Sequence, residues 1–136
     1  LFTIAEEVGL GAPHILDDDI AELVAVDNGT FAPGQNTSEY GVTIAMKDMS
    51  GPFDRKLNRH LLDLCVASGI EHARDVFKFY RSDVASALEA GYDTRASLIC
   101  FGLDASHGHE RAHVDSFVAV AELLFAYLQG PMVDQA

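Results

Sequence analysis

Carboxylate and imidazole side chains follow three separate apolar runs of this 136-residue sequence. Glu6 and Glu7 close the first run, Asp27 closes the second, and a histidine-rich segment, 104–113, follows the third. Carboxylates and imidazoles are the ligands that zinc and similar divalent ions take in proteins. A carboxylate beside such an ion can also move the proton of a water molecule. The pattern therefore indicates a candidate metal-dependent hydrolytic site.

The Glu6-Glu7 pair has two interpretations. Adjacent residues at a strand end point in different directions, so one carboxylate could bind a metal while its neighbour exchanges a proton with water. Two acids also suit the positive end of a helix dipole. On spacing alone, the pair fits a helix start better than a catalytic pair.

Asp27 follows the apolar run Leu23–Val26 directly, so its carboxylate is expected beside the core, where it needs a partner. The tripeptide Asp27-Asn28-Gly29 is also a common turn composition. Without further context, the turn is the simpler interpretation of this acid.

Three of the six histidines, His107, His109 and His113, fall within seven residues after a buried run. Glu110 and Arg111 lie between them. A metal or acid/base role is favoured over a solvated loop. The Ser106-His107 pair does not indicate a serine hydrolase, because there is no Gly-x-Ser-x-Gly elbow, and no Gly-x-Gly-x-x-Gly or phosphate-binding loop supports nucleotide binding.

Strand-like and helix-like segments alternate along the chain. This alternation predicts an α/β fold, a three-layer sandwich with a mostly parallel central sheet, in a single domain. Sites in such sheets form beyond the carboxyl ends of the strands, where the three candidate groups lie. The expected strands are 1–5, 22–27, 41–47, 76–80 and 96–103; the expected helices are 54–68 (with Gly69 as its stop), 82–90 and 115–129, with a short helix or turn at 12–19 and a loop at 28–39.

The composition of the chain limits which partners it can bind and in which compartment we expect it. The formal net charge of −12 argues against a nucleic-acid partner, because such a chain cannot neutralise phosphates. Cys65 and Cys100 each lie inside an apolar stretch, as core cysteines do, which is compatible with a reducing cytoplasm. No apolar run approaches the ~20 residues that cross a bilayer. We expect a cytoplasmic protein without a membrane segment.

The three candidate groups occur in an order that resembles the co-catalytic dinuclear zinc aminopeptidases, the family of glutamyl aminopeptidase and the tetrahedral aminopeptidases. The matching positions are Glu6-Glu7-Val8-Gly9 with Gly11-Ala12, Asp27, Ser82-Asp83, Gly91, and His107 with Glu110. The resemblance implies a metallo-aminopeptidase that hydrolyses the N-terminal residues of small peptides through a metal-bound hydroxide. It further implies Glu6 as the general acid/base, Glu7 and His107 as ligands of one divalent ion, and Asp27 as a ligand of the other, with zinc or cobalt as the two metals.

Two departures qualify this resemblance. Glu110 follows His107 by three residues rather than four, so His113 is a rival ligand and His109 a weaker one. The family's early metal-binding His, its bridging Asp and its lid-like oligomerisation domain precede the Glu-Glu pair. Because the chain begins with Leu1 inside an expected strand, we expect 1–136 to be the C-terminal part of a peptidase catalytic domain. Alone it would hold an incomplete metal site and be inactive, whereas the full-length protein would form a homo-oligomer.

A narrower resemblance concerns one bacterial branch of peptidase-like proteins, which are encoded with synthesis of the osmoprotectant N-acetylglutaminylglutamine amide. It rests on the stretches 32–35, 50–54, 80–83 and 104–108. The branch suggests an alternative function, in which a peptidase-fold protein binds a small peptide-like ligand without hydrolysing it.

Overall fold

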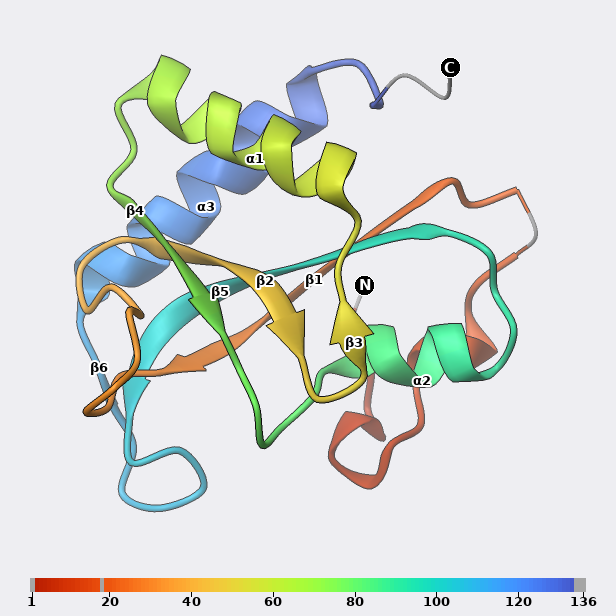
Figure 1. Cartoon of the computed structure of the whole chain (residues 1–136), viewed down its shortest axis with the longest axis horizontal. Helices are drawn as coiled ribbons and strands as arrows, with labels where there is room; N and C mark the ends of the chain where they lie inside the picture. Colours follow the sequence, from red (N-terminus) through yellow and green to blue (C-terminus); the bar gives the residue numbers. More distant parts are fainter. Residues whose placement is uncertain (1, 18, 134–136) are drawn as a thin grey trace.

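The computed structural model describes residues 2–17 and 19–133, and they form an α/β structure with one sheet between layers of helices (Figure 1). The expected fold class is confirmed. The elements in chain order are the 3₁₀ turns η1 (Glu6–Val8) and η2 (Ala12–His14), then β1 (Glu22–Thr30), β2 (Val42–Asp48), β3 (Gly51–Pro52), α1 (Arg55–Ser68), β4 (His72–Val76), α2 (Asp83–Glu89), β5 (Arg95–Asp104), β6 (Arg111–Ala112) and α3 (Val114–Gln129).

Two parallel strand pairs make up most of the sheet. β1 runs parallel to β5 over its whole length, and β2 runs parallel to β4. An antiparallel pairing of β2 with β5 joins the two pairs, and the short strands β3 and β6 pair antiparallel with β2 and β5. Because β1 and β5 are parallel, their carboxyl ends lie at the same edge of the sheet.

Helices α1 and α3 cover one face of the sheet. The Asp54 carboxylate caps α1 by accepting the Leu57 N–H at 2.7 Å, and Gly69 ends the helix at φ 69°. Leu57, Leu61 and Cys65 of α1 are fully buried against Leu123 of α3 and the sheet. The expected helix at 54–68 and its glycine stop are confirmed.

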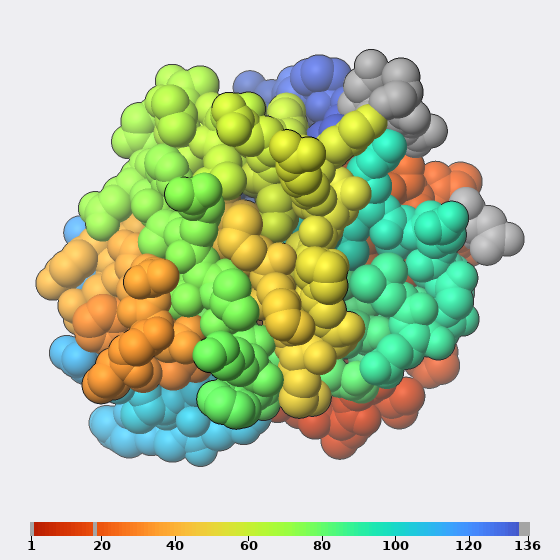
Figure 2. Space-filling view, viewed as in Figure 1, coloured from red at the N-terminus to blue at the C-terminus, as the bar shows by residue number. Residues whose placement is uncertain are grey.

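Helix α2 covers the other face. Val84 packs there with Phe77, Leu98 and Cys100, all almost fully buried. Both cysteines are free and buried, as expected of core cysteines. The N-terminal turns lie beside α2, and Figures 1 and 2 show that they share the lower edge of the molecule with the loop after β5.

Two expected strands are wrong. The strand predicted at 76–80 is β4 instead, which ends at Val76, because the Phe77 side chain turns into the core and is only 1% exposed. Residues 2–5 of the strand predicted at 1–5 are not extended into the sheet, since no described strand pairs with them and Phe2 and Ile4 are fully exposed. Leu1 lies outside the described residues.

No helix in the described ranges, 2–17 and 19–133, has both the length and the apolar character needed to cross a membrane.

Candidate functional site

A pocket of about 400 Å³ lies at the carboxyl ends of β1 and β5, on the α2 side of the sheet. Four segments of the chain line it: the N-terminal turn, β1, the start of α2 and the loop after β5. The lining residues are Glu6, Glu7, Gly9, Asp27, Asn28, Thr30, Tyr80, Arg81, Ser82, Ser86, Ser106 and His107. The structure thus brings together the four residues to which the sequence assigned catalysis and metal binding.

Glu6 and Glu7 open the 3₁₀ turn η1. The turn ends at Gly9, which adopts φ 75° and donates its N–H to the Glu6 carbonyl at 2.8 Å. Glu7 Oε2 lies 3.4 Å from His107 Nε2 across the pocket. The two interpretations of the pair are therefore compatible, because the same acids begin a short helical turn and line the pocket.

The N-terminal turns are fastened to α2 through Asp83. Its Oδ1 accepts the Ala12 N–H at 3.4 Å. Gly11 adopts φ 127° beside it, and a Cβ at this position would lie 2.8 Å from the Thr3 Cβ. A glycine is required for this close approach, which holds the Glu6-Glu7 segment against the start of α2.

Asp27 lies inside a strand, which corrects its expected place at a strand end or a turn. β1 continues to Thr30 because Asn28 and Gly29 stay paired with Phe101 and Gly102 of β5. Gly29 suits this position, since a Cβ there would lie 2.9 Å from the Cys100 Cβ. Asp27 Oδ1 accepts the backbone and side-chain N–H groups of Asn28 at 2.6 and 3.1 Å.

His107 belongs to a tight loop with unusual backbone angles. Ala105 and His107 adopt φ 56° and 64°, the left-handed region that non-glycine residues rarely occupy. The Gly108 N–H closes the loop on the Ala105 carbonyl at 2.8 Å, and the Glu110 carboxylate accepts the His107 N–H at 2.9 Å. Such conformations persist where surrounding contacts impose them, often at functional sites. Glu110 thus holds the backbone of His107 rather than lining the pocket.

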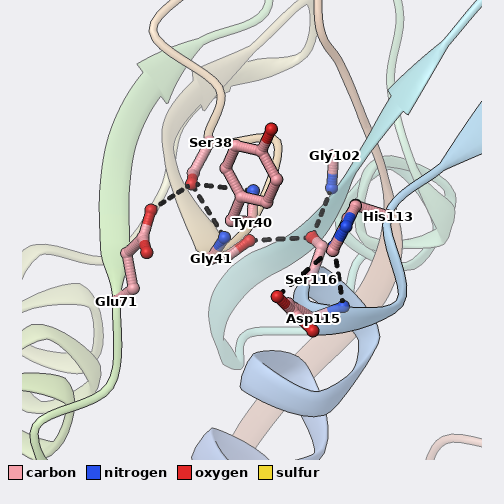
Figure 3. A network of polar contacts seen from close by, with 8 residues as sticks. All are labelled: Ser38, Tyr40, Gly41, Glu71, Gly102, His113, Asp115 and Ser116. Carbon is pink, nitrogen blue, oxygen red and sulfur yellow. Dashed lines mark hydrogen bonds and ion pairs between the residues drawn. The ribbon is translucent and has the colours of Figure 1, made fainter.

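The rival ligand His113 lies elsewhere. It is the N-cap of α3, where its Nδ1 accepts the Asp115 N–H at 3.2 Å, and its ring contacts Tyr40 with centroids 4.7 Å apart (Figure 3). Nearby, the buried Ser116 hydroxyl joins Gly41 and Gly102, as the same figure shows. Neither His113 nor the exposed His109 lines the pocket.

The acids of the pocket repel one another when ionised. Burial raises the pKa of Glu6, and the charges of Asp27, Asp83 and Glu7 raise it further, while His107 lowers it. Burial also raises the pKa of Asp27, with smaller contributions from Glu7 and Asp83, against the hydrogen bonds from Asn28 that lower it. The pocket therefore favours a bound cation, which would relieve this repulsion.

The donor types suit a divalent metal, since carboxylates and an imidazole converge. The Glu7–His107 approach is the closest such pairing that the site shows. Within residues 2–17 and 19–133, however, no three His, Cys, Asp or Glu side chains gather closely enough to hold an ion. The side chains fit a metal by chemistry, and further ligands are needed to complete its coordination.

Tyr80 and Arg81 are among the lining residues that received no catalytic or metal-binding role from the sequence. The Tyr80 hydroxyl accepts the Thr30 N–H at 3.1 Å, and burial raises its pKa far above the ordinary value. Arg81 pairs with Glu89 at 2.5 Å. The strand predicted at 76–80 concealed Tyr80, because it placed this residue in the sheet. The polar residues directly before α2 were the sequence feature that could have indicated a site there.

Known proteins resemble this chain in sequence and in fold. A model of the M42 glutamyl aminopeptidase family matches residues 1–123. The Bacillus subtilis (strain 168) protein named "Putative aminopeptidase YhfE" is 41% identical over 128 residues, which are 94% of this chain and 37% of that protein. The chain thus spans little more than a third of the length of this curated relative.

Solved structures agree with the fold. The TET1 peptidase of Pyrococcus horikoshii superimposes with a TM-score of 0.79 at 21% identity, over 93% of this chain and 39% of that one. The TET aminopeptidase of Thaumarchaeota archaeon SCGC AB-539-E09 gives a TM-score of 0.69 at 16% identity, over 93% and 37%. The match to the family model covers most of the sequence, and this chain belongs to the M42 glutamyl aminopeptidase family.

Proposed function

We propose that this chain is the C-terminal part of the catalytic domain of a metal-dependent aminopeptidase, which releases N-terminal residues from small peptides. One observation carries the proposal: Glu6, Glu7, Asp27 and His107, contributed by three distant segments, line one pocket. Membership of the M42 glutamyl aminopeptidase family supports the proposal.

Metal binding would involve three of these residues. Glu7 and His107 would hold one divalent ion and Asp27 the other, with zinc or cobalt as the metals, and ligands from the rest of the protein would complete both sites. When bound, the ions supply Lewis acidity, which lowers the pKa of water and polarises a peptide carbonyl.

Glu6 acts as the proton carrier. Its carboxylate takes a proton from the attacking water, whose oxygen forms a bond to the carbonyl carbon of the peptide. The same carboxyl group then gives that proton to the amine nitrogen as the C–N bond breaks. A raised pKa suits both duties, because a group that accepts and returns a proton works best when its pKa approaches the working pH.

The acidic pocket also suits the substrate's free amino end. An N-terminal ammonium carries the positive charge that the crowded carboxylates favour, whereas a blocked N-terminus does not. This difference would select exopeptidase over endopeptidase cleavage.

We further propose a cytoplasmic homo-oligomer. The TET1 peptidase of Pyrococcus horikoshii is described as assembling into a tetrahedron or a large octahedral shell, and its fold is shared by this chain. The two buried, free cysteines agree with a reducing compartment.

A non-hydrolytic binder is the competing function, in which the protein holds a small peptide-like ligand in an osmoprotectant pathway. The resemblance of the stretches 32–35, 50–54, 80–83 and 104–108 to the osmoprotectant-associated branch is what favours it. Aminoacyl 4-nitroanilide turnover and metal content, measured on the full-length protein, separate the two. We expect turnover that chelation abolishes and zinc or cobalt restores; a metal-free protein that binds peptides without cleaving them would refute the peptidase assignment.

A further inference from the structure

Three contacts hold Tyr80 in place: one through its ring, one through its backbone carbonyl and one through its hydroxyl. Its ring packs on the buried Phe77, with centroids 4.8 Å apart and planes at 32°. Its carbonyl accepts the Met49 N–H at 3.2 Å, and its hydroxyl accepts the Thr30 N–H at 3.1 Å. Held in this way, the phenol keeps one position on the pocket wall, which it shares with Glu6 and Asp27.

The backbone hydrogen bond from Thr30 does not use the phenolic proton of Tyr80. A tyrosine hydroxyl can accept one hydrogen bond and donate another. Here the oxygen accepts the backbone N–H of Thr30, and the Thr30 side chain is a second hydrogen-bonding neighbour of the phenol. The phenol remains protonated at neutral pH. A positioned donor therefore lies on the wall of the pocket.

Several other polar groups of the pocket are acceptors or are already paired, although the serine hydroxyls of the lining, among them the Ser82 Oγ, which has no partner within the described residues, can also donate. Glu6, Glu7 and Asp27 offer carboxylate oxygens, which suit cations and water protons. The Asn28 amide donates to Asp27, and the Arg81 guanidinium pairs with Glu89. A neutral donor beside so many acceptors is suited to a substrate oxygen that gains negative charge during the reaction.

We propose that Tyr80 is a catalytic residue, whose hydroxyl donates a hydrogen bond to the substrate's carbonyl oxygen as the peptide bond is attacked. This inference rests on the proposed aminopeptidase function. When the oxygen of water bonds to the carbonyl carbon, the π electron pair moves onto the carbonyl oxygen, which becomes an alkoxide. Tyr80 stabilises that charge without transferring its proton, and the pair returns when the C–N bond breaks and Glu6 protonates the amine.

The competing interpretation is structural, because the hydroxyl also accepts the Thr30 N–H near the end of β1. Tyr80→Phe in the full-length protein separates the two, since phenylalanine keeps the contact with Phe77 and removes only the hydroxyl. With the best substrate from a panel of aminoacyl 4-nitroanilides, we expect kcat to fall about 100-fold, the loss typical of one oxyanion donor, and KM to stay within about twofold. Tyr40→Phe is the matched control, because the Tyr40 ring is exposed and outside the pocket, and it should match wild type.

The affinities of two inhibitors distinguish a catalytic role of the Tyr80 hydroxyl from a purely structural one. An α-aminoalkyl phosphonate carrying the side chain of the best substrate resembles the charged transition state, whereas the free amino acid resembles the product. Tyr80→Phe should weaken the phosphonate by about the same factor as kcat/KM and leave the amino acid within about twofold, as expected for a contact made in the transition state. Equal weakening of both inhibitors, or a kcat within about threefold of wild type, overturns the proposal for Tyr80.

A second variant covers the case in which Tyr80→Phe fails to fold. Replacement of Tyr80 by 3,5-difluorotyrosine keeps the acceptor for Thr30 but lowers the pKa of the phenol. Activity should then fall at alkaline pH values at which wild type is still active, and a superimposable pH profile contradicts the proposal. A wild-type protein that hydrolyses no substrate would overturn the proposed aminopeptidase function itself. If the wild type is active and the Tyr80 variants behave like it, only the role of Tyr80 is refuted.

Discussion

His107 Nε2 and Glu7 Oε2 lie 3.4 Å apart, although the two residues are far apart in the sequence. The parallel pairing of β1 with β5 produces this approach. It aligns the carboxyl ends of the two strands, so the loop after β5 reaches the N-terminal turn that lies beside α2. An ion pair between two exposed side chains contributes little to the stability of the fold. A cation bound between them would explain why the two side chains approach each other.

Replacement of Glu6 by alanine tests the proton carrier. In the full-length protein, Glu6→Ala should lower kcat at least about 100-fold, since positioned acid/base groups contribute that much or more. Metal content should stay near that of wild type, because Glu6 is not assigned as a ligand. The measurements are turnover of an aminoacyl 4-nitroanilide and metal analysis by plasma mass spectrometry. Glu122→Ala removes an exposed acid of α3 and should keep full activity; full activity in Glu6→Ala would exclude the assignment.

The ligand assignments predict a different pattern. Glu7→Ala and His107→Ala should each weaken metal binding more than about tenfold, because even loss of a residue that only orients a ligand costs 10–100-fold. His113→Ala is the control, since it removes an imidazole outside the pocket. It should keep its metal and lose about 1 kcal/mol of stability at most, as expected for an N-cap. Titration with Zn²⁺ checks all three, and stoichiometric metal in both pocket variants would remove Glu7 and His107 from the ligand set.

Asp27 should make stability depend on pH. Because its pKa is raised in the folded chain, the folded state binds this proton more tightly than the unfolded state does. The contribution of Asp27 is therefore most favourable below the unfolded pKa of about 3.9 and is lost as the pH rises through the folded pKa. In the metal-free chain, Asp27→Asn should raise Tm at pH 7 and raise it less toward pH 4.

The control for Asp27 is Asp63→Asn, an exposed carboxylate whose ion pair with Arg59 lies on the surface of α1. It should change stability by less than about 0.5 kcal/mol. Thermal melts at several pH values provide the comparison. A difference between Asp27→Asn and wild type that is the same at every pH would contradict the role given to the Asp27 charge.

A substitution at Gly102 should destabilise the fold through a steric clash that does not involve the pocket. A Cβ at this position would lie 2.2 Å from the Ser38 carbonyl oxygen, so the backbone of one segment must move. Gly102→Ala should cost about 1–3 kcal/mol or more in the free energy of unfolding, as overpacked sites do. Gly130→Ala meets only ordinary contacts at 3.6 Å and should stay within about 0.5 kcal/mol. Urea denaturation measures both, and equal effects would disprove the steric argument.

The sequence predicted the α/β class, the helices at 54–68, 82–90 and 115–129, and the meeting of Glu6, Glu7, Asp27 and His107. Hydrophobic period was sufficient for the helices, whereas the grouping of the four residues followed from the resemblance to the aminopeptidase family, because Glu6-Glu7 follows no described strand and Asp27 lies inside one. Tyr80 could not be found, because a Val-Phe run before it resembles a strand while the Phe77 side chain in fact leaves the sheet. The placement of His113 depends on a cap at α3, and the shape of the His107 loop depends on Glu110, both of which are contacts that periodicity does not reveal.

Asp27 stands three residues before the end of β1, in register with Cys100, and the ladder continues as the Phe31 N–H donates to the Leu103 carbonyl at 2.8 Å. The turn that follows β1 is thus separated from the carboxylate by several rungs of paired backbone. At Gly34 a Cβ would have no heavy atom within 4 Å, so this turn is open, although its φ of 87° favours glycine. The length of this loop and the position of the Asp27 carboxylate are therefore independent, and the turn at 32–34 can be lengthened or exchanged while Asp27 keeps its place.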